Sequence, residues 1–198
     1  MGLILDNQPG QTPLDEDEKE GLLITTIINR SELDEFEQKN IEEAIQWTLG
    51  RKLKPTTLFS EAFILQLHYR MYGQVWAWAG SYRKTNKNIG VDKWQIPVAI
   101  KTLLDDVLFW VNNQTMSPET IAIHFKHRLV SIHCFANGNG RHSRLMADLI
   151  ISKVYGQTEF SWGSANPKEA DLQRDQYLQA LRAADKGDMS LLMDFAKS

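Results

Sequence analysis

The chain has 198 residues, of which 42% are hydrophobic, 24% charged and 10% aromatic. This composition predicts a globular protein and excludes disordered, collagen-like and coiled-coil chains. The net charge of −3 hides an asymmetry, because residues 1–43 carry twelve acidic and three basic side chains, whereas residues 44–198 carry thirteen and nineteen. An acidic segment of charge −9 therefore precedes a basic remainder of +6, which needs an anionic partner.

Cysteine usage and hydropathy predict the compartment. The single cysteine, Cys134, excludes an internal disulfide and favours a reducing environment. No apolar run approaches the ~18–20 residues that span a bilayer, and the N-terminus lacks the basic stretch and cleavage pattern of a signal peptide. We therefore expect a cytoplasmic protein that makes no membrane contact.

Helical periodicity dominates the first part of the chain. Residues 1–14 are typical of an extended arm, and Thr12 is a candidate cap for a short acidic helix. A long amphipathic helix is expected from Ser31 to Gly50. After a basic link, apolar spacing predicts another helix over residues 58–72, followed by a glycine.

One irregular excursion interrupts the second part. Residues 73–96 are rich in glycine and asparagine and favour a loop with a small hairpin, whose strands lie near residues 81–83 and 89–91. Further helices are predicted over 97–111, from Ser117-Pro118 to 132, over 140–154, after Asn166, and over 190–197. The pattern therefore predicts an all-α domain.

The segment 133–144 carries the chemistry. It reads His-Cys-Phe-Ala-Asn-Gly-Asn-Gly-Arg-His-Ser-Arg, so a glycine-rich turn opens a helix whose N-terminal amides attract anions. Arg141 and Arg144 lie three residues apart on one helix face, and guanidinium groups match phosphate oxygens. His133 precedes the turn and suits a general base. These features predict transfer chemistry on a nucleotide phosphate.

This segment resembles the Fic motif, H-P-F-x-D/E-G-N-G-R-x-x-R. Cys134 stands where proline is usual, and the matching residues are His133, Phe135, Gly138, Asn139, Gly140, Arg141 and Arg144. Residues 67–70 (Leu-His-Tyr-Arg) and 78–83 (Trp-Ala-Gly-Ser-Tyr-Arg) resemble the family's preceding helix and the start of its flap, so the similarity spans about residues 55–160. The whole chain also resembles the subgroup called mobile mystery protein B, including its Thr-Pro-Leu-Asp opening.

The resemblance implies a fold and a domain division. We expect the all-α Fic helical bundle with a small β-hairpin flap. Residues 55–198 would form the Fic domain with its C-terminal helices. Residues 1–54 would form an acidic helical region that regulates it.

The implied activity is protein adenylylation, the transfer of AMP from ATP to a Ser, Thr or Tyr hydroxyl of a target protein. His133 would accept the hydroxyl proton. Gly138, Asn139 and Gly140 would cradle the α- and β-phosphates, and Arg141 and Arg144 would hold the β- and γ-phosphates. The flap that pairs with the target would comprise Lys84, Thr85, Asn86, Lys87, Asn88, Ile89 and Gly90.

Asn137 departs from the family pattern. It occupies the position of the carboxylate that normally binds Mg²⁺ in the family. An amide oxygen can bind Mg²⁺ or Mn²⁺ but brings no charge, so we expect weak metal affinity at Asn137.

Many Fic proteins carry an inhibitory glutamate that pairs with the second arginine of the motif, here Arg144. The segment 16–21 ends in Glu20-Gly21 and matches the end of the inhibitory pattern, whereas Ser31 and Glu35 match its spacing. We favour Glu20, with Glu35 as the alternative, because Glu20 lies 48 residues before His68, a separation that resembles that in family members with an N-terminal inhibitory helix. Its carboxylate would be offered to Arg144 in place of a phosphate.

Two other functions stay open. The same fold can transfer another nucleotide, a phosphoryl group or phosphocholine. The chain can also be a non-catalytic module that binds protein or nucleic acid, because residues 76–101 mix aromatic and basic side chains. We regard nucleic acid as the less favoured partner. The subgroup resemblance also implies a small helix-turn-helix protein as partner.

Overall fold

The computed structural model describes residues 13–163 and 170–198, which form helices and turns. Within these ranges, no helix combines the length and apolar character needed to cross a bilayer. The elements are α1 (Glu16–Lys19), α2 (Arg30–Leu49), α3 (Pro55–Leu58), α4 (Glu61–Tyr72), η1 (Lys93–Gln95), α5 (Ile96–Asn113), α6 (Pro118–Ile132), α7 (Asn139–Leu149), the π-helical turn η2 (Ile150–Val154), α8 (Ala170–Ala184) and α9 (Ser190–Lys197). The all-α prediction is confirmed.

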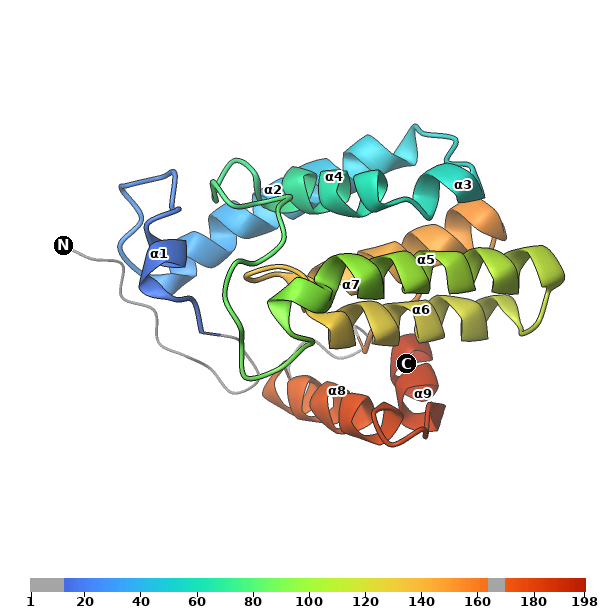
Figure 1. Cartoon of the computed structure of the whole chain (residues 1–198). Coiled ribbons are helices and arrows are strands. Elements are labelled where there is room, and N and C mark those ends of the chain that lie inside the picture. The colour runs from blue at the N-terminus through green and yellow to red at the C-terminus, as the bar shows by residue number, and fades with distance from the viewer. Residues whose placement is uncertain (1–12, 164–169) are drawn as a thin grey trace.

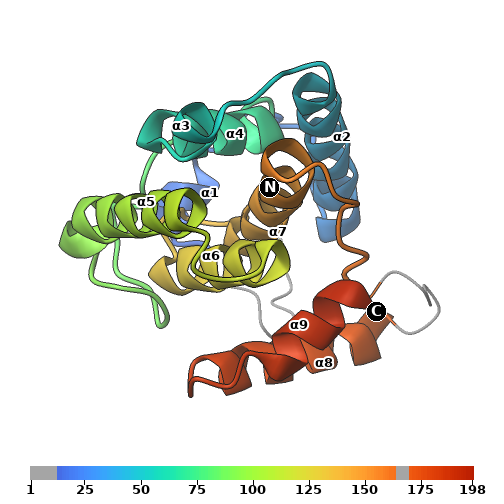
Figure 2. The same ribbon diagram turned by 90° about the vertical axis from the view of Figure 1, so that its right-hand side faces the viewer.

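The helices stack in layers. Figure 1 shows α2 and α4 side by side above α5 and α6, and Figure 2 shows α8 and α9 as a separate layer beyond α6. Helix α7 runs against α6 and also contacts α4, so it lies inside the bundle. The predicted functional segment connects α6 to α7 and therefore lies between the layers.

Helix boundaries follow their caps. Ser117 caps α6 as predicted, since its hydroxyl accepts a hydrogen bond from the Thr120 N–H. The prediction of Ser31 as the cap of α2 is wrong, because Asn29 accepts from the Glu32 N–H and the helix begins at Arg30. The helix predicted over 58–72 begins only at Glu61, because Ser60 caps α4 by accepting from the Phe63 N–H, and Leu58 ends the preceding turn α3. The candidate caps Thr12 and Asn166 lie outside the described residues.

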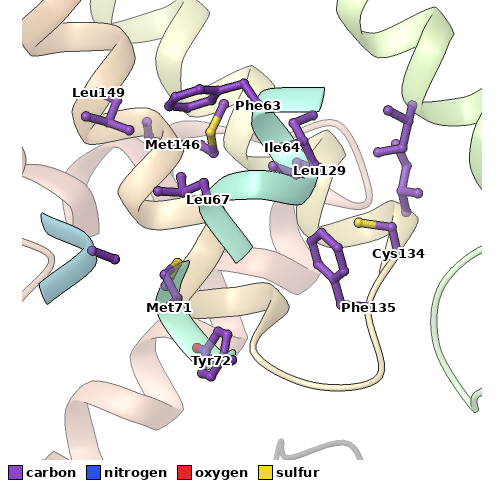
Figure 3. Packing of buried hydrophobic residues seen from close by; sticks show 14 of the residues in the cluster. Phe63, Ile64, Leu67, Met71, Tyr72, Leu129, Cys134, Phe135, Met146 and Leu149 are labelled. Atoms are coloured by element: carbon purple, nitrogen blue, oxygen red, sulfur yellow. The ribbon is translucent and has the colours of Figure 1, made fainter. Parts of the chain in front are cut away.

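The core lies between α4, α6 and α7. Its side chains are almost wholly buried, and each large one contributes about 1.5–3 kcal/mol relative to exposure. Figure 3 shows Phe63, Ile64, Leu67 and Met71 of α4 packed with Leu129 of α6 and with Met146 and Leu149 of α7. Helix α2 belongs to the same cluster through Leu33, Ile41 and Ala44. The domain boundary at residue 54 stays a prediction.

The predicted hairpin is corrected to a loop without strands over residues 84–92. The backbone N–H groups of Arg83 and Val91 donate to the carbonyl groups of Cys134 and Ile132 instead of pairing with each other. The Arg83 guanidinium fills the space between the arms and donates to the carbonyls of Thr85 and Val91. Hydrogen bonds from the Arg83 side chain therefore replace the backbone hydrogen bonds expected between the two strands of the hairpin.

Candidate active site between α6 and α7

The loop that joins α6 to α7 is a tight turn with two residues in the left-handed region. His133 ends α6 with φ 54°, and Gly138 begins α7 with φ 79°. A left-handed conformation is uncommon for a residue with a side chain and is typical of functional sites. The turn leads from His133 to the N-terminus of α7, whose first amides have no acceptor within the helix and favour an anion.

Asn139 holds this loop closed. Its side-chain oxygen accepts from the Phe135 N–H at 3.0 Å, and its side-chain nitrogen donates to the Phe135 carbonyl at 2.9 Å. Both polar atoms of the buried Asn139 side chain are therefore engaged inside the loop. The backbone amide of Asn139 is therefore the group that can bind a phosphate, whereas its side chain fixes the shape of the loop.

His68 of α4 supports the loop from below. Its ring stacks on Phe135 with centroids 3.6 Å apart and an interplanar angle of 13°. Its Nδ1 accepts from the Gly80 N–H, so Nε2 carries the proton and donates to the Asn137 carbonyl at 3.1 Å. Burial holds the pKa of His68 well below its usual range, so this ring stays neutral. The sequence resemblance included His68 but assigned it no role.

His133 lies under the flap. Its side chain is buried, and a Cβ on Gly90 would come within 2.6 Å of the His133 Cβ, so only glycine permits this approach. The Arg83 Nε–H donates to the His133 carbonyl at 2.6 Å. Burial, with Arg83 and Lys87 nearby, lowers the pKa of His133 to about 4. The imidazole is therefore neutral at physiological pH and able to accept a proton.

The two arginines of the motif have different partners. An Arg141 terminal nitrogen donates to Glu37 Oε2 of α2 at 2.6 Å, and its guanidinium lies 5.2 Å from the Tyr72 ring centroid. Arg144 instead lies over Tyr177 of α8, 4.8 Å from that ring centroid. Both arginines begin on the first turns of α7, but each is held by a different layer of the bundle.

A buried lysine completes the contact of α8 with Arg144. The Lys126 ammonium donates to the Tyr177 hydroxyl at 2.7 Å and is wholly inaccessible to solvent. Burial, followed by the nearby Arg144, holds the pKa of Lys126 well below its usual range. No sequence motif marks Lys126, although it lies on the α6 face that also carries apolar residues.

The acidic segment reaches the site through Glu37. Glu37 is 1% exposed, and its second oxygen accepts from the Trp76 indole N–H at 2.7 Å. Glu20 and Glu35, the residues favoured from sequence, are exposed, and no ion pair joins them to Arg144 in the described part of the chain. Their inhibitory role stays a prediction. The missed signal was the position of Glu37 between Leu33 and Ile41 on the buried face of α2.

The flap is tethered to α1. The Lys87 ammonium contacts Asp15 at 2.9 Å and Glu18 at 2.5 Å, and the Thr85 hydroxyl donates to Asp15 at 2.6 Å. Ile89, in contrast, is 49% exposed. Lys84, Asn86 and Asn88 are also exposed. The predicted target-binding flap thus covers His133 while the α1 carboxylates neutralise its buried lysine.

The donor set around Asn137 does not make up a metal site. The Asn137 side-chain oxygen accepts from the Gly138 N–H at 2.7 Å, and it is a neutral ligand. Among the described residues, no group of three His, Cys, Asp or Glu side chains is arranged to hold a metal ion. Protein-bound Mg²⁺ usually takes one or two carboxylates besides its phosphate ligands, so no step is assigned to a resident metal here.

Cys134 is a structural residue. Its thiol is buried, and burial raises the pKa of Cys134 above the usual range, which keeps the sulfur protonated. The side chain therefore packs as a small hydrophobic group behind His133 and supplies no thiolate.

Comparison with known proteins identifies the domain. The sequence model of the Fic/DOC family matches residues 58–151. A Fido domain-containing protein of Dictyostelium discoideum is 37% identical over 70 residues, which cover 35% of this chain and 43% of that protein. The protein adenylyltransferase Fic of Drosophila grimshawi is 29% identical over 136 residues, which cover 67% of this chain and 26% of that protein. The matches thus span less than half of either relative.

Solved structures share the fold. A BepC effector protein of Bartonella tribocorum with bound AMPPNP superposes with a TM-score of 0.69 at 17% identity, covering 92% of this chain and 97% of that chain. Fic-1 from C. elegans has a TM-score of 0.69 at 23% identity, covering 90% of this chain and 51% of that one. Residues 58–151, which hold the flap, His133 and both arginines, therefore form a Fic/DOC family domain.

Proposed function

We propose that the chain is a protein adenylyltransferase that transfers AMP from ATP to a Ser, Thr or Tyr hydroxyl of a target protein. The observation that carries the proposal is a neutral, buried His133 beside the glycine-rich N-terminus of α7, with Arg141 and Arg144 on the following turn. Relatives named protein adenylyltransferase support the same reaction class.

In this reaction the target hydroxyl oxygen attacks the α-phosphorus of ATP. The bond from the α-phosphorus to the oxygen that bridges it to the β-phosphorus breaks, pyrophosphate leaves with that oxygen, and His133 accepts the hydroxyl proton. The amides of residues 139 and 140 face the α- and β-phosphates, Gly138 forms the turn that precedes them, and the arginines neutralise the leaving pyrophosphate. Mg²⁺ or Mn²⁺ would enter as the ATP complex, as part of the substrate.

The main contribution of the chain to this reaction is to hold the loop that carries His133 in a fixed position. Arg83 joins the flap to the His133 carbonyl, while Asn139 and His68 hold the loop from inside. A loop fixed in this way presents its amides and imidazole without rearrangement at the moment of reaction. These contacts favour catalysis over a merely structural use of the motif.

Labelled nucleotides test the proposal. We expect label from α-labelled ATP to appear on protein, either on the chain itself or on a target from a lysate, and to be absent with His133→Ala. Parallel reactions with CTP, GTP and UTP identify a different nucleotide preference. Label that comes only from γ-labelled ATP would indicate phosphoryl transfer, and no transfer from any nucleotide by any variant described below would favour the non-catalytic binding module.

We further propose that an N-terminal glutamate restrains the reaction and that Glu37 is this residue. The buried Glu37 carboxylate holds Arg141, one of the two groups expected to bind the polyphosphate, so the carboxylate competes with an anionic ligand. Glu20 and Glu35 remain candidates from the sequence pattern. Exposure of both side chains favours Glu37, because a screened surface carboxylate attracts an arginine weakly.

Three matched variants separate these glutamates. Glu37→Gln keeps an oxygen for the Trp76 N–H but removes the charge that holds Arg141. We therefore expect the rate of autoadenylylation to rise about tenfold, which corresponds to a loss of ~1.4 kcal/mol in the competition of Glu37 with ATP for Arg141. Glu20→Gln and Glu35→Gln should leave the rate unchanged. A rise with Glu20→Gln or Glu35→Gln and none with Glu37→Gln would return the inhibitory role to that residue.

A further inference from the structure

Tyr72, the last residue of α4, carries a buried hydroxyl that has no hydrogen-bond partner in the described part of the chain. The whole side chain is 1% exposed. A buried hydroxyl without a partner is destabilising, and such groups in proteins usually have an explanation in a missing ligand, ion or water. Phenylalanine would fill the same space without this penalty, so the hydroxyl itself needs a reason.

The hydroxyl lies against the phosphate-binding turn. Figure 3 shows Tyr72 at the end of α4, beside the loop that carries Phe135. A Cβ at Gly138 would come within 2.5 Å of the Tyr72 Cε2 and 2.8 Å of its hydroxyl oxygen. Gly138 is the residue that precedes α7 and caps it, so the phenol contacts the turn at the N-terminus of α7. The glycine at this position is what permits the approach.

The Tyr72 ring lies against Arg141, the first arginine of the motif. The Arg141 guanidinium is 5.2 Å from the Tyr72 ring centroid, and the charges of Arg141, Glu37 and Arg144 all act on the phenol. Arg144 shares the deficiency of Tyr72, since its Nε–H is also buried and without an acceptor among the described residues. Two unpaired donors thus flank the turn where the polyphosphate is expected.

We propose that the Tyr72 hydroxyl donates to an oxygen atom of the β- or γ-phosphate of bound ATP, beside Arg144, which the proposed function already assigns to these phosphates. This inference rests on the proposed function and adds Tyr72 as a nucleotide-binding residue. A phosphate oxygen supplies the acceptor that this hydroxyl lacks, and hydrogen bonds to a charged acceptor are stronger than neutral ones. Tyr72 thereby distinguishes a triphosphate from a monophosphate.

The protonation state of Tyr72 agrees with a donor role. Burial raises the pKa of Tyr72 to about 12, with Arg141 acting in the opposite direction. The phenol is therefore protonated throughout the physiological range and adds no negative charge that would repel phosphate. Glu37 holds Arg141 over the ring, so a bound phosphate would compete with Glu37 for that arginine as it reaches Tyr72.

Tyr72→Phe is the decisive variant because it removes one oxygen and keeps the ring. We measure the affinities for AMPPNP and for AMP by calorimetry, and the thermal stability of the ligand-free protein. AMPPNP should bind about tenfold more weakly to Tyr72→Phe, as expected for one lost hydrogen bond to a charged group. AMP affinity should stay the same, and the ligand-free protein should be as stable as the parent or more stable.

Tyr69→Phe is the matched control. Tyr69 lies one turn earlier on α4 and is 57% exposed. Loss of its hydroxyl should therefore change neither the AMPPNP affinity nor the thermal stability. Equal AMPPNP affinity of Tyr72→Phe and the parent would overturn the inference while leaving the proposed function intact. A parallel loss of AMP affinity and stability would assign Tyr72 a purely structural role and would also overturn it. A parent protein that binds neither nucleotide would overturn the proposed function and this inference together.

Discussion

The acidic N-terminal region meets the basic remainder at two contacts that differ in burial. The outer contact joins Lys87 of the flap to Glu18 of α1 and to Asp15, which precedes α1 and is 47% exposed. The inner contact joins Glu37 of α2 to Arg141 of α7, and Glu37 is 1% exposed. Both pair a carboxylate with a base, but the outer contact buries its base, since Lys87 is 4% exposed, whereas the inner contact buries its acid and leaves Arg141 33% exposed.

The difference separates two consequences of the same charge pattern. The inner carboxylate has no solvent to satisfy it, so its geometry is fully determined by Arg141 and Trp76. The outer carboxylates differ from each other, because Glu18 is 11% exposed whereas Asp15 reaches solvent. The charge split of −9 and +6 is therefore realised as one contact at the phosphate site and one contact that ties the flap to the N-terminal region.

The largest effect is expected when the proposed general base is removed and both ion-pair contacts are kept. His133→Ala should lower transfer by about 10²–10⁴-fold, the usual contribution of a general base, and should leave AMPPNP affinity close to that of the parent. Single-turnover transfer and calorimetry measure the two quantities. Transfer at the parental rate would show that His133 is not the base and that the contacts near it act on something else.

A fall in pH should lower the free energy of unfolding through the buried histidines before it protonates Asp15 of the outer contact. Burial lowers the pKa of both His133 and His142 to about 4, so the unfolded chain binds more protons than the folded one between pH 6.5 and 4. Their stabilisation is complete above pH 6.5 and is lost as the pH falls toward 4, by roughly 3 kcal/mol for each histidine.

Asp148 opposes this trend, because burial raises its pKa to about 7 and its stabilisation is lost as the pH rises. Two histidines outweigh one carboxyl, so the free energy of unfolding should fall from pH 6.5 to pH 4. Urea titrations of the parent and of His142→Gln measure it, and the variant should show the shallower slope. The Asp15 contact should persist, because Thr85 and Lys87 hold the pKa of Asp15 below its usual value.

Breaking the inner contact comes next in size. Glu37→Leu removes the acceptor of both Arg141 and the Trp76 N–H, and should lower the free energy of unfolding by about 2–3 kcal/mol. The value lies below that of a fully buried pair because the Arg141 side chain is 33% exposed. Urea denaturation measures it. Glu35→Leu, on the exposed face of the same helix, should change stability by less than about 0.5 kcal/mol.

The smallest effect belongs to the outer contact. Lys87→Met should lower the free energy of unfolding by about 1–2 kcal/mol, because Glu18 loses its cation but keeps the Asp15 N–H, while the Asp15 carboxylate returns to water. Hydrogen exchange of the amides over residues 84–92 should nevertheless accelerate, since the flap loses its tether to α1. Lys84→Met removes an exposed flap lysine and serves as the control. Equal exchange in both variants would show that α1 does not hold the flap.

Local signals in the sequence were sufficient for most helices and for the phosphate-binding turn. Ser117-Pro118 marks the start of α6, and the glycines around Asn139 mark the turn before α7. The prediction of a hairpin was wrong because the hydrogen-bond partners of Arg83 and Val91 lie at the end of α6 and in the loop after it, some 40 to 50 residues away. Local sequence patterns do not show hydrogen-bond partners this far along the chain. The pattern therefore predicted that the two short segments would pair with each other as strands.

The sequence by itself determined the helical class, the acidic and basic segregation, and the grouping of His133 with Arg141 and Arg144 near one turn. Only the tertiary structure decided which acid meets which base and which donor is left unpaired. Glu37 and Arg141 are 104 residues apart, and Tyr72 meets Gly138 from a different helix. Helical periodicity fixes the direction of each side chain about its own axis, whereas its partner depends on how the helices pack.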